Sequence, residues 1–189
     1  MERFNTTLMK NILTLLIVVV TLQLYGQSKD SLPIYTAKAN EYMMKGLYDK
    51  ALSSCNSALR IDSNNCKFLK IKGNILTSLG KQAEAIALYK KSINKNCNVV
   101  FNCLTLKSIY FDEGKDADAL FYLNKVIGLK PDSGALYYER WSIKTKMKDT
   151  NGTAEDLQKA IKLGCQSAII MDKEIRKKEK EPVEVEEKE

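Results

Sequence analysis

Three glycines at equal intervals constrain the fold of this chain more than any other feature of its sequence. Gly46, Gly80 and Gly114 lie 34 residues apart, and an alanine follows each of them five positions later. A fixed period of this length indicates a chain built from stacked copies of one supersecondary unit. The three alanines are Ala51, Ala85 and Ala119.

Four units of this period follow one another without a gap, and we number repeat positions from the first residue of each unit. In the fourth unit Lys148 replaces the glycine, but Leu157 and Ala160 stay in phase with their counterparts in the third. The units span residues 32–65, 66–99, 100–133 and 134–165.

Within each unit the apolar residues have helical spacing. In the first unit Ala51, Cys55 and Ala58 form one stripe with the i, i+4, i+7 pattern of an amphipathic helix. Each glycine falls between two such stripes, where a residue with positive φ can end one helix and begin the next. The polar runs at 62–65 and 130–133 separate the units. The sequence therefore predicts an all-α fold, an α-solenoid of four antiparallel helix hairpins.

The C-terminal end of the array is predicted to carry a capping helix over residues 166–180, because the last hairpin would otherwise leave an apolar face uncovered. Ala168, Met171 and Ile175 form the apolar stripe of that helix. Residues 181–189 contain five Glu, a composition that buries too little apolar surface to fold. We expect a disordered, solvated acidic tail there, and a docking ligand is the alternative interpretation.

The N-terminal residues 1–26 have the layout of a secretory signal peptide. Arg3 and Lys10 form a basic region, residues 12–24 are largely apolar, and Gly26 is a small residue at a suitable cleavage position. The apolar run is shorter than the ~20 residues that a membrane-spanning helix needs. We expect a cleaved signal peptide, a short linker over residues 27–31, and an exported protein, periplasmic or secreted, without a stable membrane span. An uncleaved segment that anchors the protein to the membrane is the alternative.

The composition argues against catalysis. The chain has no histidine, which excludes His-based nucleophilic sites and most zinc sites. The acidic pairs Asp112–Glu113 and Glu155–Asp156 lie beside predicted turns, and we interpret them as solvated helix caps rather than acid/base pairs. The formal net charge of +7 comes from lysines scattered along the chain, a pattern that does not indicate nucleic-acid binding. We therefore expect no enzyme activity, catalytic residue, cofactor or metal site.

The repeat resembles the tetratricopeptide repeat, whose pattern has an aromatic, a small residue, a tyrosine, an alanine, a second aromatic and a proline in that order. With the signal layout, the resemblance suggests an exported bacterial protein of this kind, and it covers about residues 32–165. The matching residues are Tyr35 and Tyr137, Ala39 and Gly73, Tyr42 and Tyr110, the three alanines, Tyr89, and Pro131. The departures are Lys107 and Trp141 at the small position, Lys144 at the tyrosine position and Thr153 at the alanine position.

The resemblance implies a non-enzymatic protein–protein interaction scaffold in the cell envelope, which binds a protein or peptide segment in the concave groove of the repeat stack. The alternative is a structural subunit of an envelope assembly, held by its tail or convex face. Neither interpretation specifies the partner or an oligomeric state. A carboxylate clamp for chaperone C-termini is not expected, because only Asn40 matches its positions. The resemblance places these residues at the groove: Asn40, Met43, Met44, Lys67, Lys70, Asn74, Phe101, Leu104, Phe111 and Tyr138.

The five cysteines raise a separate question. Cys55 is predicted to be a small buried hydrophobe in the second helix of its unit. Cys66, Cys97 and Cys103 fall at helix ends on one edge of the stack, where the oxidising environment of an exported protein allows a disulfide. We predict a Cys66–Cys97 disulfide, with Cys97–Cys103 as the next pairing and free thiols as the alternative. Cys165 is the counterpart of Cys97 two units later.

The first testable prediction concerns processing. The exported protein should begin at or near Gln27, because Gly26 is the well-placed small residue after the apolar run. Mass spectrometry of the N-terminus of protein isolated from the cell envelope measures this directly. Recovery of a chain that still begins at Met1 in that fraction would support the anchored alternative.

Overall fold

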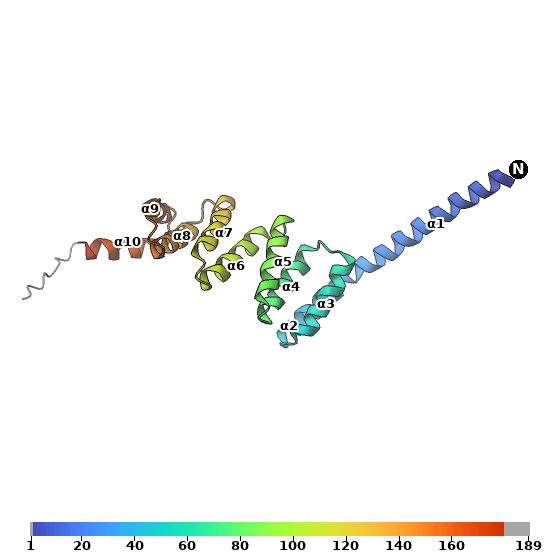
Figure 1. Cartoon of the computed structure of the whole chain (residues 1–189), viewed down its shortest axis with the longest axis horizontal. Helices are drawn as coiled ribbons and strands as arrows, with labels where there is room; N and C mark the ends of the chain where they lie inside the picture. The colour runs from blue at the N-terminus through green and yellow to red at the C-terminus, as the bar shows by residue number, and fades with distance from the viewer. Residues whose placement is uncertain (1, 180–189) are drawn as a thin grey trace, which may run out of the picture. The chain divides into compact units, whose positions relative to one another are not determined.

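The computed structural model describes residues 2–179, with side chains at 8–21 and 29–179, and this range contains helices and no strands (Figure 1). The predicted all-α repeat fold is confirmed. The chain divides after Asn98 into two units, and each is described by itself. The helices are α1 (Glu2–Asp30), α2 (Leu32–Met44), α3 (Tyr48–Ile61), α4 (Cys66–Ser78), α5 (Gln82–Asn94), α6 (Val99–Asp112), α7 (Asp116–Leu129), α8 (Gly134–Lys146), α9 (Thr153–Lys162) and α10 (Gln166–Lys178).

The first unit contains two stacked hairpins, α2–α3 and α4–α5, with α3 packed against α4. Small residues lie at the centre of the packing: Ala39, Ala51 and Ala58 are fully buried. Helices approach each other most closely where the side chains at their crossing are small. Phe68 and Ile75 of α4 fill the space between the two hairpins.

The second unit contains the hairpins α6–α7 and α8–α9, followed by α10, which packs on α9 and α8. Ala119 and Ala160 are fully buried in it, and Ala168 of α10 is buried against Leu157 and Ala160. Helix α10 thus covers the last hairpin, as a capping helix should. Lys180, the last residue of the predicted cap, and the predicted tail at 181–189 lie outside the described residues.

The four hairpin turns share one backbone conformation. Gly46, Gly80 and Gly114 have φ of 69°, 71° and 71°, which confirms the predicted positive φ, and Lys148 at the same repeat position has φ of 57°. In each turn this residue and the next one donate to carbonyls of the preceding helix; Lys148 N and Thr145 O are 3.0 Å apart. These bonds form the Schellman motif that ends a helix. A non-glycine residue in this conformation costs roughly 1–2 kcal/mol, so the surrounding structure holds Lys148 there against its own preference.

Repeat position 8 of the first helix and position 24 of the second pack together most closely in the second hairpin. In the second hairpin these residues are Gly73 and Tyr89, both buried. A Cβ atom on Gly73 would overlap the Tyr89 ring, so the glycine makes room for the aromatic side chain. The Tyr89 hydroxyl donates to Asn74 Oδ1 over 3.2 Å and lies 3.3 Å from Thr77 Oγ1.

A second recurring contact joins repeat positions 11 and 23. In the third hairpin it is a parallel stack of Tyr110 and Tyr122, with ring centroids 5.8 Å apart. In the fourth hairpin the same positions hold Lys144 and Asp156, whose Nζ and Oδ2 atoms are 3.1 Å apart. Lys144 departs from the repeat pattern, and its partner Asp156 is likewise a charged residue at a position that is uncharged in the other hairpins.

Asp156 corrects one prediction. The sequence suggested a solvated helix cap, but the Asp156 side chain is only 3% exposed and accepts from Arg140 Nε at 2.9 and 3.1 Å. The repeat alignment could have suggested burial, because Lys144 and Asp156 occupy repeat positions that are buried or half-buried in the other hairpins. A buried carboxylate needs such partners, since a buried charge without them is strongly destabilising.

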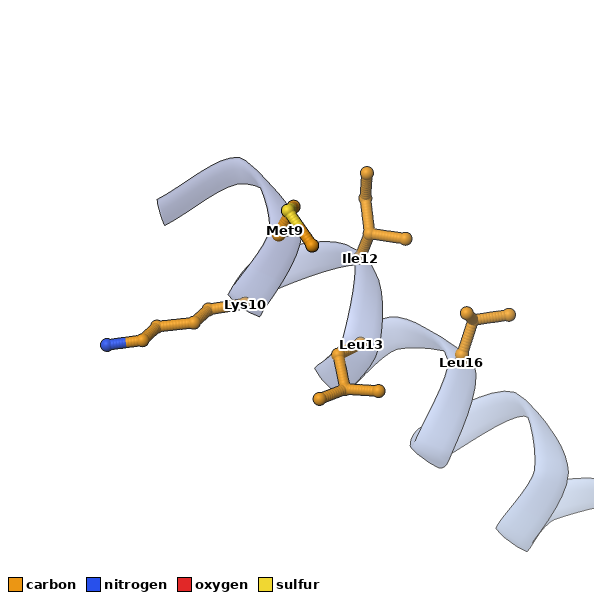
Figure 2. Close-up of a pocket in the computed structure, with 5 residues that line it drawn as sticks. All are labelled: Met9, Lys10, Ile12, Leu13 and Leu16. Carbon is orange, nitrogen blue, oxygen red and sulfur yellow. The ribbon is translucent and has the colours of Figure 1, made fainter. Parts of the chain in front are cut away.

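Helix α1 is continuous from Glu2 to Asp30, so residues 27–30 of the predicted linker extend this helix. Its apolar side chains between Leu8 and Val20 are 44–65% exposed. Among the described residues, no helix has the length and apolar character that are needed to cross a membrane. The shallow hollow in Figure 2 is lined by α1 alone, so it is the uneven surface of one helix; its residues are Met9, Lys10, Ile12, Leu13 and Leu16.

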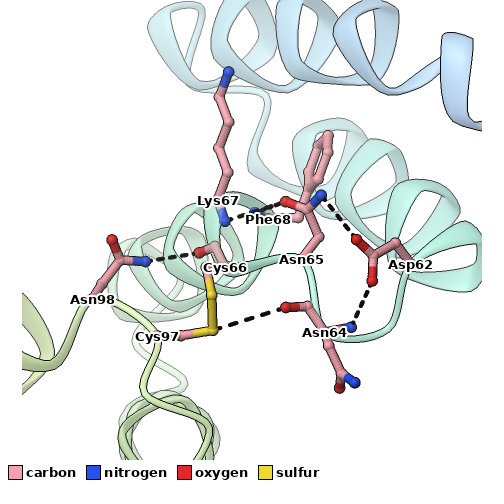
Figure 3. Close-up of a disulfide and its surroundings, with 8 residues drawn as sticks. All are labelled: Asp62, Asn64, Asn65, Cys66, Lys67, Phe68, Cys97 and Asn98. Carbon is pink, nitrogen blue, oxygen red and sulfur yellow. Dashed lines mark hydrogen bonds between the residues drawn. A yellow bond between two sulfur atoms is a disulfide. The ribbon is translucent and has the colours of Figure 1, made fainter.

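A disulfide between Cys66 and Cys97 closes the open end of the second hairpin (Figure 3). Cys66 is the first residue of α4 and Cys97 follows the end of α5, and their Cα atoms are 5.1 Å apart. The Asn98 side-chain amide donates to the Cys66 carbonyl over 2.9 Å. Asn65 caps α4, since its Oδ1 accepts from Lys67 N and Phe68 N at 3.2 and 3.4 Å. The start of α4 is thus held by a cap and a covalent bond.

The contact between Gly73 and Tyr89 predicts the effect of an added methyl group. Gly73→Ala should lower the free energy of unfolding by about 1–3 kcal/mol, because the buried ring has no room to move. Gly128→Ala is the matched control: it lies in helix α7 with nothing within 4 Å of the new Cβ. The control should raise stability by up to about 1 kcal/mol, through helix propensity. Urea unfolding followed by circular dichroism measures both, and equal effects of the two substitutions would contradict this packing.

The states of the five cysteines predict how many thiols react with a thiol reagent under each condition. Burial raises the pKa of the Cys55 thiol to about 11 and also raises the pKa of Cys103, so both thiols stay protonated and unreactive near pH 8. Half-buried Cys165 should therefore be the one thiol that reacts rapidly with Ellman's reagent in the folded, oxidised protein.

Denaturation without reductant should raise the count to the three free cysteines, and reduction should raise it to five. Reduction should also lower stability by about 3–4 kcal/mol, because the disulfide restricts the unfolded chain. Five reactive thiols in denaturant without reductant would show that the disulfide does not form.

Candidate partner-binding site

A hollow of about 210 Å³ opens between α6 and α8, the first helices of the two hairpins in the second unit. Two of the predicted groove residues, Phe111 and Tyr138, line it. Residues four positions apart on a helix share a face, so Phe111 lies beside Lys107 on α6 and Tyr138 lies beside Ser142 on α8. The other lining residues are Lys107, Glu139, Ser142 and Ile143.

An ion pair crosses the hollow. Lys107 Nζ of α6 lies 3.1 Å from Glu139 Oε2 of α8, and the two side chains are 16% and 43% exposed. Lys107 occupies the position that is small in the first two hairpins, and here its long side chain reaches the next hairpin instead. The pair is half-buried, with the Lys107 side chain mostly covered and the Glu139 side chain partly open to water.

The two aromatic rings of the hollow, Phe111 and Tyr138, each contact a neighbouring side chain. Lys146 Nζ lies 4.4 Å from the Phe111 ring centroid and donates to Asp116 Oδ1 over 2.9 Å. Tyr138 stacks on Trp141 with centroids 5.3 Å apart. These contacts reduce the freedom of both rings, so a bound partner would lose less entropy in ordering them. Phe111 nevertheless remains 36% exposed.

The predicted groove residues of the first unit lie on α2 and α4. Asn40 and Lys67 are exposed, whereas Met43 packs against the core cluster and Lys70 is half-buried. Asn74 is half-buried and accepts the hydrogen bond from Tyr89, so its side-chain oxygen is occupied within the hairpin. Met44 is 83% exposed.

In the second unit Phe101 and Leu104 are half-buried on α6, and neither lines the hollow. Sequence reasoning missed the other four lining residues, Lys107, Glu139, Ser142 and Ile143. Lys107 was visible as a departure from the repeat pattern, but its partner was not, because an ion pair between two hairpins depends on how they stack.

The chemistry of this site favours binding over reaction. Its groups are aromatic rings, an aliphatic side chain, a hydroxyl and an ion pair. Within residues 2–179, the structure brings together no group of His, Cys, Asp and Glu that could hold a metal ion. Partly exposed aromatic residues in a hollow are the usual anchors of a protein interface.

Comparison by sequence identifies the repeat in the first unit. The profile of the Tetratricopeptide repeat family matches residues 32–65 and 71–94. These are the hairpins that have small residues, Ala39 and Gly73, at repeat position 8. The search of curated proteins found no significant match.

Comparison by structure extends the likeness to most of the chain. A fragment of MamA from Desulfovibrio magneticus RS-1 superposes with a TM-score of 0.59 at 20% identity, over 71% of this chain and 76% of that one. YrrB, described as a TPR protein with an unusual peptide-binding site, gives 0.57 at 20% identity, over 77% and 76%.

A tetratricopeptide repeat protein from Parabacteroides merdae gives a TM-score of 0.64 at 20% identity, over 72% of this chain and 55% of that one. Identities this low show a shared fold. No catalytic family is indicated, and tetratricopeptide repeat proteins are typically non-enzymatic scaffolds. The first two hairpins thus match the tetratricopeptide repeat by sequence, and the chain has the fold of proteins that generally serve as protein–protein interaction modules.

Proposed function

We propose that this protein is an exported scaffold of the cell envelope that binds a segment of a partner protein in the hollow between α6 and α8. The observation that carries the proposal is the 36% exposure of Phe111 beside Tyr138 and Ile143 in that hollow. Apolar surface left in water costs about 25 cal/mol per Å². A partner that covers these rings recovers that free energy on binding.

The charges around the hollow define the kind of segment that fits. Phe111, Tyr138 and Ile143 favour an aliphatic or aromatic anchor. Lys146, which is 50% exposed, lies over Phe111 and could receive a partner carboxylate beside that anchor. Lys67 and Lys70, the two lysines among the predicted groove residues, belong to the first unit. The proposed ligand is therefore an apolar anchor next to an acidic residue.

Export is the second part of the proposal. It rests on the signal layout of residues 1–26 and on the exposed apolar side chains of α1 between Leu8 and Val20. The Cys66–Cys97 disulfide supports it, because disulfides persist mainly in oxidising compartments. The periplasm or the extracellular space is the proposed location, and an α1 that stays attached as an anchor is the alternative.

A different surface favours the alternative function, a structural subunit held by its outer face. On α7, Phe121 and Leu129 are 57% and 55% exposed, and Lys125 Nζ lies 5.6 Å from the Phe121 ring centroid. These residues lie eight positions apart on one side of the helix, with Lys125 between them. A large assembly could cover this stripe and leave the hollow empty.

Reciprocal substitutions distinguish the two functions. Phe111→Ala and Tyr138→Ala should each weaken partner binding by about 2 kcal/mol or more, roughly 30-fold, as loss of an aromatic anchor does. Phe121→Ala, an equal truncation in the same unit, should leave binding unchanged. The partner is first captured with a photocrosslinking residue in place of Ser142, which is exposed in the hollow, and its affinity is then measured with purified protein.

The controls show whether a variant has lost its fold. Circular dichroism should show the same helix content in all three variants, and a crosslinker in place of Lys125 reports the outer face of α7. Crosslinks from position 125 alone, with binding lost only in Phe121→Ala, would contradict the hollow and support the structural subunit.

A further inference from the structure

A second, larger hollow of about 440 Å³ lies on the fourth hairpin and the capping helix. Its apolar walls are Trp141 of α8, Ala154 and Leu157 of α9, and Ile175 of α10, and Lys148 lies at its rim. It shares no residue with the hollow between α6 and α8.

This hollow arises because α9 starts late. Helices α3, α5 and α7 begin at repeat position 17, at Tyr48, Gln82 and Asp116, whereas α9 begins at position 20, at Thr153. Residues 150–152 therefore do not supply the first helical turn that packs on the first helix in the other hairpins. The space of that missing turn is open.

Hydrogen bonds hold the loop before α9 in this open form. Thr153 Oγ1 donates to the Asp149 carbonyl over 2.5 Å, and Asn151 N donates to Asp149 Oδ1 over 3.0 Å. Lys144 Nζ, which also pairs with Asp156, donates to the Asn151 carbonyl over 2.8 Å. The polar groups of the loop hydrogen-bond to one another, so the loop gains no further hydrogen bonds by moving into the hollow.

We propose that the hollow receives the C-terminal segment of this same chain, residues 180–189. Ile175 lines the hollow, and the segment begins five residues after it. Ten residues reach up to roughly 33 Å when extended, so the segment is long enough to return. Val183 and Val185 alternate with Glu184 and Glu186, and in an extended segment alternate residues face the same side. Both valines would then face the apolar walls, with the glutamates toward water.

Charge and tethering favour this occupant over a separate molecule. Residues 134–179 contain ten Lys and Arg against seven Asp and Glu, while residues 180–189 contain five Glu against two Lys. The two parts therefore attract each other at low ionic strength. A short tether also gives an effective concentration of the order of 1 mM, so even a contact with a Kd of about 1 mM is half occupied.

Trp141 reports occupancy without a label, because it is the only tryptophan of the chain and it lines the hollow. The test compares the full chain with its Val183→Ser/Val185→Ser variant and with a chain that ends at Glu179. Both altered chains should show red-shifted Trp141 emission and about two-fold greater access of acrylamide, as expected if half the molecules are covered. The peptide KEPVEVEEKE, added in millimolar amounts, should reverse the change in the shortened chain.

The matched control is Glu184→Asp/Glu186→Asp, which changes two residues that would face water, keeps both valines and the charge of the segment, and should leave the emission unchanged. Thermal unfolding should confirm that every variant is folded. Identical emission and quenching in the full chain and the valine variant would overturn the proposal. Emission that depends on protein concentration would also overturn it, in favour of a second copy as the occupant. Neither outcome bears on Phe111 or Tyr138, so the proposed function is tested separately.

Discussion

Close packing of the hairpins depends on the side chains at repeat positions 8 and 24, most clearly in the second hairpin. Gly73 leaves room for the ring of Tyr89, and Ala39 lies opposite Cys55, both fully buried. In the fourth hairpin the sizes are reversed, with Trp141 on the first helix and Leu157 on the second. The fourth hairpin thus holds a larger pair of side chains at these positions than the second.

Departures from the repeat pattern also shape the surface of the protein. Where the first two hairpins carry small residues at position 8, the third carries Lys107, whose charge reaches Glu139 and forms one edge of a hollow. Where they carry an alanine at position 20, the fourth carries Thr153, whose hydroxyl binds the loop and helps to keep another hollow open. A repeat that follows its pattern packs closely, and a repeat that departs from it creates surface features that can be used for recognition.

The repeat pattern predicted most of the fold because its period is local. Positive φ at Gly46, Gly80 and Gly114 and burial of Ala51 follow from residues within one hairpin. The candidate site was predictable in part: Phe111 and Tyr138 line one hollow, but Lys107 and Glu139 were missed. Asp156 was wrongly expected to be solvated, because the sequence shows that it is charged but not that Arg140 and Lys144 reach it. Contacts of this kind depend on side chains that meet across helices, which periodicity alone does not specify.

The disulfide of the second hairpin also changes what a cut in the backbone can do. Cys66 precedes almost all of α4 and Cys97 follows the whole of α5, so the turn at Leu79–Lys81 lies inside a covalent ring. A protease that cleaves this exposed turn would leave two pieces that remain linked, with both helices still packed on each other. For this hairpin a single break in the backbone would therefore not release a fragment.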